Sequence, residues 1–257
     1  MRLILVQPQL DHSDGADNLG AISQTLRAAK IEPVKSDVLL LPERVTMTHS
    51  REQYRRAISD LARQFGCNVV GGSHHEARDG DVVNAGIAVD ADGAVLGRYE
   101  KVRPYAGERA GVRGGSAPGE FAIGGRRFLV LICADFWFSD LFHQAQHLPD
   151  VVLVPALSVS RKATPAYSRE LWRHLAIARA YEMGTYVGVS DWGHPSSLPM
   201  LFTSGVGGFA DPTGVDPERF FRPIDPSGAS VYDLDFERLG QFRQDRIDRG
   251  FFWKREI

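Results

Sequence analysis

Residues 128–140 read FLVLICADFWFSD, and the run of apolar strand-forming residues within them ends at Cys133. An acid, Asp135, follows two residues later. A free cysteine in such a run usually packs as a small hydrophobic side chain. A catalytic thiol would need a base and a group that stabilises an oxyanion, both supplied from elsewhere in the chain. The rest of the sequence decides between these two interpretations.

The composition indicates one globular domain over residues 1–257. The chain has 257 residues, of which 43% are hydrophobic, and a formal net charge of -2. This balance gives no basic surface for nucleic acid or for an anionic membrane. The first ten residues, MRLILVQPQL, carry an apolar run too short for a signal peptide. With only two cysteines, a disulfide framework is not expected, and we predict a cytoplasmic protein without membrane spans.

Strand-like runs alternate with helical patterns along the whole chain. Apolar runs of the kind found in buried strands cover residues 3–7, 37–42, 68–73, 84–90, 128–134, 150–156, 185–191, 204–211 and 230–236. Helical patterns cover residues 16–30, 50–65 and 168–184, and turn sequences at 90–93 and 211–214 indicate hairpins. This order predicts an α/β protein with mixed sheets, built as one wide sheet or as two stacked sheets with helices outside.

Two further strand ends carry reactive groups. Glu43 follows the run DVLLLP, in which Pro42 stops the strand, and Lys101 follows the predicted hairpin around residues 90–93. With Cys133 these residues form a coherent set for cleaving a carboxamide. Glu43 would take the thiol proton, and Lys101 with the backbone N–H of Ala134 would stabilise the tetrahedral oxyanion. Water would then hydrolyse the resulting thioester.

The ordered set of motifs resembles the nitrilase, or carbon–nitrogen hydrolase, superfamily from end to end. The stretches that carry the resemblance are DVLLLPE, NAGIAVDADGAVLGRYEKV, FLVLICADFWFSD, VVLVPALSV with ELWRHLAIARAYEMGTYVGVS, and GGFADPTG. The Glu, Lys and Cys that typify the family correspond to Glu43, Lys101 and Cys133. The resemblance implies a four-layer α-β-β-α sandwich with two mixed sheets, no cofactor, no metal and a homodimer or higher homo-oligomer.

The resemblance also implies a second glutamate. The motif PYAGE at 104–108 supplies Glu108, one residue closer to the lysine than in comparable amidases. Its implied role is to orient Lys101 and the attacking amine or water. A surface charge network with Arg109 and Arg113 is the alternative for Glu108.

The sequence departs from the family beside the nucleophile. Ala134 stands where an aromatic residue is usual, and we expect it to enlarge or reshape the substrate pocket. Candidates for substrate binding are Ala134, Trp137, Arg161 and Trp192, of which Arg161 could bind a carboxylate. Trp137 and Phe138 could equally be dimer contacts. Residues 220–230 also differ from the usual family sequence, and their role stays open.

Simpler interpretations apply to the other polar candidates. We expect Asp135 to hydrogen-bond to backbone or to an arginine, and Cys67 to pack at a turn between a helix and a strand. His143 and His147 have one-turn spacing that can hold zinc, but no third ligand is evident nearby. His74 and His75 are expected in a loop near a strand end.

The leading functional hypothesis is a cofactor-free thiol amidohydrolase that converts a small carboxamide into a carboxylate and ammonia through a cysteine thioester. One alternative keeps the same residues but cleaves an N-carbamoyl amide or a nitrile. A second alternative is a catalytically silent interaction scaffold.

Overall fold

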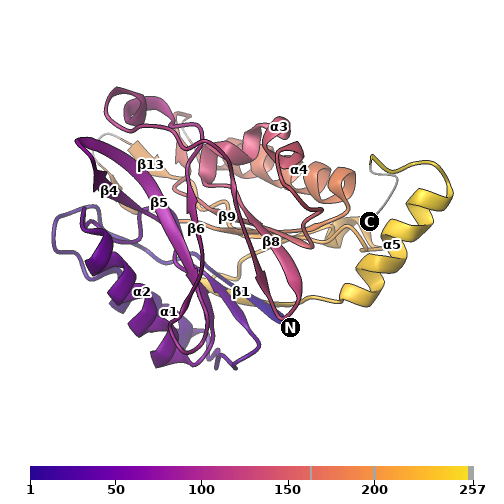
Figure 1. Ribbon diagram of the computed structural model, residues 1–257, viewed down its shortest axis with the longest axis horizontal. Coiled ribbons are helices and arrows are strands. Elements are labelled where there is room, and N and C mark those ends of the chain that lie inside the picture. The colour runs from indigo at the N-terminus through magenta and orange to yellow at the C-terminus, as the bar shows by residue number, and fades with distance from the viewer. Residues whose placement is uncertain (163, 199–200, 254–257) are drawn as a thin grey trace.

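The computed structural model describes residues 1–162, 164–198 and 201–253, and in these the strands form two large mixed sheets and one small sheet (Figure 1). The first sheet has the order β16 (Ala229–Asp233), β1 (Arg2–Val6), β2 (Val38–Leu40), β3 (Asn68–Val70), β5 (Asp81–Val89) and β4 (His74–Arg78), with β6 (Val95–Glu100) also paired to β5. The second has the order β15 (Phe221–Pro223), β14 (Gly208–Ala210), β11 (Tyr186–Ser190), β9 (Val151–Pro155), β8 (Arg126–Val130) and β7 (Gly119–Ile123). The small sheet joins β10 (Val159–Ser160), β13 (Leu201–Thr203) and β12 (Ser197–Leu198).

Helices cover the outer faces of the two stacked sheets. Figure 1 shows α1 (Asn18–Ala28) and α2 (Arg51–Phe65) on one side, and α3 (Ser139–His143) and α4 (Ala166–Met183) on the other. The four-layer α-β-β-α sandwich with two mixed sheets is therefore confirmed. Helix α5 (Phe236–Asp248) lies at one end, and short 3₁₀ helices span Ala106–Ala110 (η1), Cys133–Trp137 (η2) and Pro217–Arg219 (η3). No helix in the described ranges is long and apolar enough to cross a membrane.

Two apolar clusters fill the spaces between the layers, and strand β1 contributes to both. Leu3 and Leu5 belong to the cluster between the two sheets, whereas Ile4 and Val6 belong to the cluster beneath α1 and α2. Successive side chains of a strand point to opposite faces, so β1 is apolar on both. This is why the central strands read as continuous apolar runs.

A capping serine begins α2 and a glycine ends it, and the helix covers the residues that the sequence predicts. Ser50 caps α2 by accepting a hydrogen bond from the N–H of Gln53, and Gly66 ends it in the left-handed conformation at φ +62°. The hairpin at 90–93 is also confirmed, with β5 and β6 antiparallel on either side. At Gly72, φ is +65° and a Cβ atom would lie 1.9 Å from the carbonyl oxygen of Pro42, so this close approach of two backbone segments requires glycine.

Several predicted boundaries are wrong. Helix α4 begins at Ala166 rather than Ser168, and the last predicted strand ends at Asp233 because Asp235 caps α5. The turn at 211–214 does not close a tight hairpin, because η3 lies between β14 and its antiparallel partner β15. His74 and His75 lie in β4 rather than in a loop. Strand β4 and helix α5 were not predicted, because both are polar and lack the apolar runs by which buried elements are recognised.

The segment 220–230, left open by the sequence, carries the chain from the second sheet to the first. It contains β15, and the N–H of Gly228 then donates to the carbonyl of Asp225 at 2.9 Å to form a turn. The Gln7 N–H donates to the Gly228 carbonyl at 2.7 Å, which fixes this turn beside the end of β1.

The expected homodimer, which a single chain does not test, stays a prediction.

Hydrogen bonds between the two sheets set their relative position. The hydroxyl of Ser190 in β11 donates to the Leu40 carbonyl of β2 at 2.8 Å and accepts from the Val6 N–H of β1 at 3.0 Å. All three residues are buried. A polar side chain is tolerated in this otherwise apolar layer because it makes hydrogen bonds to two buried backbone groups.

Replacing Ser190 with alanine leaves the Val6 N–H and the Leu40 carbonyl without this partner. We expect Ser190→Ala to lower the free energy of unfolding by about 1–3 kcal/mol in urea denaturation. Ser36→Ala, at an exposed serine, is the matched control and should stay within about 0.5 kcal/mol of wild type. Equal stability of the two variants would contradict the role of Ser190.

Candidate active site

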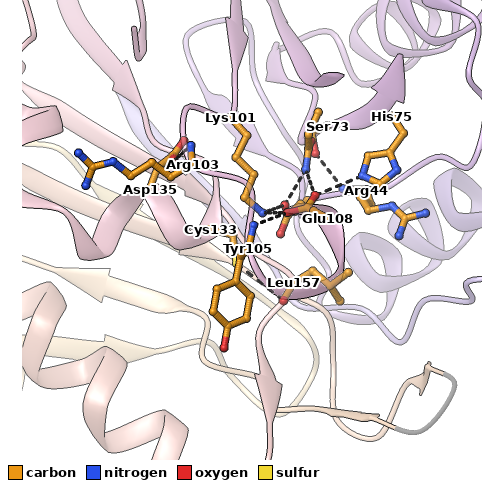
Figure 2. A network of polar contacts seen from close by, with 12 residues as sticks. Arg44, Ser73, His75, Lys101, Arg103, Tyr105, Glu108, Cys133, Asp135 and Leu157 are labelled. Carbon is orange, nitrogen blue, oxygen red and sulfur yellow. Dashed lines mark hydrogen bonds and ion pairs between the residues drawn. The ribbon is translucent and has the colours of Figure 1, made fainter. Parts of the chain in front are cut away.

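Lys101, Glu43 and Glu108 form a buried ion-pair cluster near the ends of strands of the first sheet. The Lys101 ammonium donates to Glu43 Oε1 at 2.7 Å. It also donates to Glu108 Oε2 at 2.5 Å (Figure 2). Lys101 is 2% exposed and Glu43 3% exposed. Burial would lower the pKa of Lys101, but attraction to the carboxylates of Glu43 and Glu108 outweighs it and raises that pKa. Lys101 is therefore a fixed cation.

Asn84 in β5 links the two carboxylates. Its side-chain amide nitrogen donates to Glu43 Oε1 and to Glu108 Oε1, each at 2.8 Å. Rotating the amide would place its oxygen against two carboxylates, so this orientation is the one that the chemistry allows. Asn84 therefore holds both acids in place around the ammonium.

Glu108 has further partners on the side away from Glu43. His75 Nε2 lies 3.2 Å from Glu108 Oε1, and the Tyr105 N–H donates to Glu108 Oε2 at 3.1 Å. Burial would raise the pKa of Glu108, but the hydrogen bond from His75 and the charge and hydrogen bond of Lys101 hold it well below its ordinary value. Glu108 is accordingly a carboxylate at neutral pH.

Cys133 lies at a strained turn directly after a strand of the second sheet. Its φ is +48°, which is rare for a residue with a side chain, and η2 begins there. The thiol is 8% exposed and donates to the Leu157 carbonyl at 3.8 Å. Burial and the charge of Glu43 raise the pKa of Cys133, while the charge of Lys101 lowers it. The resting group is therefore a protonated thiol that lies in the field of a cation and a carboxylate.

Asp135 ties the cysteine turn to the lysine loop. Its carboxylate accepts the N–H groups of Val102 at 2.9 Å and of Arg103 at 2.8 Å, as the sequence led us to expect of this residue. Burial raises the pKa of Asp135 to about 6, although these two hydrogen bonds favour the charged form. The contact fixes a segment of the first sheet against a segment of the second.

Glu43 is held from the second sheet as well. Its N–H donates to the Ala156 carbonyl at 3.2 Å, and its carbonyl accepts the Trp192 indole N–H at 2.7 Å. Trp192 is fully buried in the cluster beneath α1 and α2. The prediction that Trp192 binds substrate therefore does not fit its position: its aromatic ring packs in the core and its N–H positions Glu43.

A cavity of about 300 Å³ opens beside Cys133. Two of the predicted substrate-binding residues, Ala134 and Trp137, line it, and their role in binding stays a prediction; Arg161 is exposed and is not among the described residues that line it. Phe138, Leu157, Leu171 and Trp172 contribute further apolar surface. The pattern of residues at strand ends could not reveal Leu171 and Trp172, because both come from α4.

The other candidates have partners outside this cavity. His143 lies edge-on to Trp253 with ring centroids 5.1 Å apart, and His147 Nδ1 lies 3.7 Å from Glu120 Oε2. Cys67 is buried between α2 and β3, where burial raises its pKa to about 12.

The structure brings together Glu43, Lys101, Glu108 and Cys133, and their catalytic roles stay predictions. Asn84 and His75 were missed as members of the site. A polar Asn in a buried strand was the available signal for the first.

The depressed pKa of Glu108 makes stability depend on pH. An acid whose pKa is lower in the folded state stabilises the fold fully above its unfolded value, and this contribution is lost as the pH falls toward the folded pKa. From its ordinary value of 4.5 downward, the stability advantage of wild type over Glu108→Gln should shrink by up to about 1.4 kcal/mol per pH unit. Urea denaturation at a series of pH values measures this difference.

The control for the pH experiment is Glu32→Gln, at an exposed glutamate. Its difference from wild type should stay within about 0.5 kcal/mol throughout. A wild-type advantage over Glu108→Gln that does not change with pH would show that the ion pair does not hold Glu108 in its charged form.

Comparisons with known proteins identify the family and the fold. The carbon–nitrogen hydrolase family model matches residues 2–214. Nit3 of Saccharomyces cerevisiae, a nitrilase-superfamily member, superposes with a TM-score of 0.78 at 22% identity, over 95% of this chain and 93% of its own. A CN-hydrolase superfamily protein of Xanthomonas campestris, XC1258, has a TM-score of 0.75 at 21% identity, with 95% and 94% covered.

An amidase from Nesterenkonia sp. AN1 superposes with a TM-score of 0.71 at 22% identity, over 98% of this chain and 100% of its own. No curated protein sequence matches the chain significantly. At these identities the solved structures establish the fold, and the family model identifies the family. The chain belongs to the carbon–nitrogen hydrolase family of the nitrilase superfamily.

Proposed function

We propose that this carbon–nitrogen hydrolase is a thiol amidohydrolase, which cleaves a carboxamide to a carboxylate and ammonia through a thioester on Cys133. The observation that carries the proposal is the buried Lys101 ammonium, paired with two carboxylates and adjacent to a buried thiol that opens onto a cavity. A structural cysteine would need neither the cation nor the acids. Amidase activity is also what is described for the Nesterenkonia protein of the same fold.

The first half of the reaction forms the thioester. In the described part of the chain, both hydrogen bonds to the Glu43 carboxylate use Oε1, so Oε2 is available to take the thiol proton. As that proton leaves, the sulfur attacks the carbonyl carbon of the amide. The negative charge that develops on the carbonyl oxygen is stabilised by the Lys101 ammonium and the Ala134 N–H. The first N–H groups of a helix lack partners within it, and Ala134 is the second residue of η2.

The second half releases both products. Glu43 returns its proton to the leaving nitrogen, which departs as ammonia. A water molecule then loses a proton to Glu43 and attacks the thioester carbon, so the carboxylate product leaves and the thiol is restored. Glu108 supports both halves by holding Lys101 in position, through the contact at 2.5 Å. No redox step is involved, and the net reaction consumes one water for each amide.

Two substitutions of the nucleophile test the proposal. Cys133→Ala should abolish ammonia release from a panel of simple amides, and Cys133→Ser should keep less than about 1% of activity, because a carboxylate base is matched to a thiol rather than to a less acidic hydroxyl. Circular dichroism should show that both variants keep the fold. Activity of the alanine variant above about a tenth of wild type would remove Cys133 as the nucleophile.

The same panel separates the alternatives when it includes N-carbamoyl amino acids and nitriles. Turnover of either class with no turnover of amides would replace the amidase proposal with that activity. No turnover of any class would favour the silent scaffold.

A further inference from the structure

The cavity beside Cys133 has walls that are almost entirely apolar. Trp137 and Trp172 meet edge to face with ring centroids 5.7 Å apart, and Leu157 and Leu171 add aliphatic surface. Trp137 is 41% exposed and Leu171 is 40% exposed, so both reach the mouth of the cavity. Such walls bind a hydrocarbon group by removing it from water.

The polar lining residues offer little to a charged group. The Ser158 hydroxyl is already committed as a donor to the buried carboxylate of Asp191. Ser168, from the first turns of α4, and Tyr105 are the other polar side chains among the described lining residues. None of the described lining residues carries a charge.

Arg103 and Lys162, two cations close in sequence to the lining residues, have other partners, and Arg161 is exposed and is not among the described lining residues. Arg103 donates to Asp140 at 2.5 Å, and its guanidinium lies 4.0 Å from the centre of the Phe138 ring. Lys162 lies over the exposed ring of Tyr167 at 5.5 Å. Because none of the described lining residues is a cation, a substrate carboxylate in this cavity would lose water without gaining a cation from its walls, which is strongly unfavourable.

Ala134 sets the size of the space next to the thiol. Its methyl group lines the cavity, and the volume of about 300 Å³ lies at the lower end of the usual range for ligand sites. We propose that the acyl group of the substrate is uncharged, apolar and larger than acetyl, of about the size of a hexanoyl or phenylacetyl group. This proposal rests on the proposed amidohydrolase function and names its substrate class.

Neutral and charged amides of matched length test the substrate class. For acetamide, butanamide and hexanamide, we expect kcat/KM to rise about fourfold per added methylene, because each buried methylene contributes a similar increment of binding. Phenylacetamide should be turned over comparably to hexanamide. The monoamide of adipic acid, which carries a carboxylate where hexanamide has its terminal methyl, should react at least about a hundredfold more slowly.

Two variants locate the selectivity in the cavity. Ala134→Trp should lower the ratio of kcat/KM for hexanamide to that for acetamide by roughly tenfold, since the indole occupies the space of several methylenes. Leu171→Arg, at a half-exposed position that tolerates a charge, should raise the ratio of kcat/KM for the adipic monoamide to that for hexanamide by about fivefold. Leu171→Met is the neutral control and should change that ratio less than about twofold.

The outcomes are distinguishable. If wild type prefers the adipic monoamide, or shows no dependence on chain length, the apolar substrate class is wrong although the amidohydrolase proposal stands. If no amide is turned over and none forms an acyl adduct on Cys133, the proposed function fails and the substrate class falls with it. The Leu171 pair keeps the test valid should Ala134→Trp fail to fold.

Discussion

The site depends on one interaction, the buried ammonium of Lys101 held between the carboxylates of Glu43 and Glu108. A lone charge at that depth would cost several kcal/mol, so each member of the cluster requires the others. Asn84, in strand β5, donates hydrogen bonds to both carboxylates. His75 and the Tyr105 N–H make further polar contacts with the Glu108 carboxylate. A cation fixed in this way cannot swing out to solvent, which is what the proposed stabilisation of a developing oxyanion requires.

The two sheets contribute different parts of this chemistry, so their relative position matters. The acids, the lysine and Asn84 belong to the first sheet and its loops, whereas Cys133 follows β8 of the second. Ser190, Trp192 and Asp135 each make hydrogen bonds between the two halves. The strained φ of Cys133 costs on the order of 1–3 kcal/mol. The bonds from Asp135 next to it help to keep the turn in that conformation and aim the thiol at the cavity.

Much of the fold could be predicted because its central strands are apolar on both faces and its helices are capped by recognisable residues such as Ser50 and Gly66. The positions of Glu43, Lys101 and Cys133 near strand ends could be predicted because each follows an apolar strand or a predicted hairpin. Polar elements such as β4 escaped prediction because their contacts are made by charges and by pairing with β5, not by an apolar pattern. Trp192 was misassigned because a residue after a strand end can point into the core as well as into the site. Arg161 is not among the described residues that line the cavity, because loop conformation, which the sequence does not specify, decides which side chains reach it.

The central claim is that the sulfur of Cys133 attacks an amide within this cluster and carries the acyl group. Rapid acid quenching during turnover of hexanamide, followed by intact-protein and peptide mass spectrometry, tests it directly. The account predicts a transient mass increase equal to hexanamide minus ammonia, located on Cys133 and absent from Cys133→Ala. Steady ammonia release without any acyl adduct, or with the adduct on another residue, would contradict it.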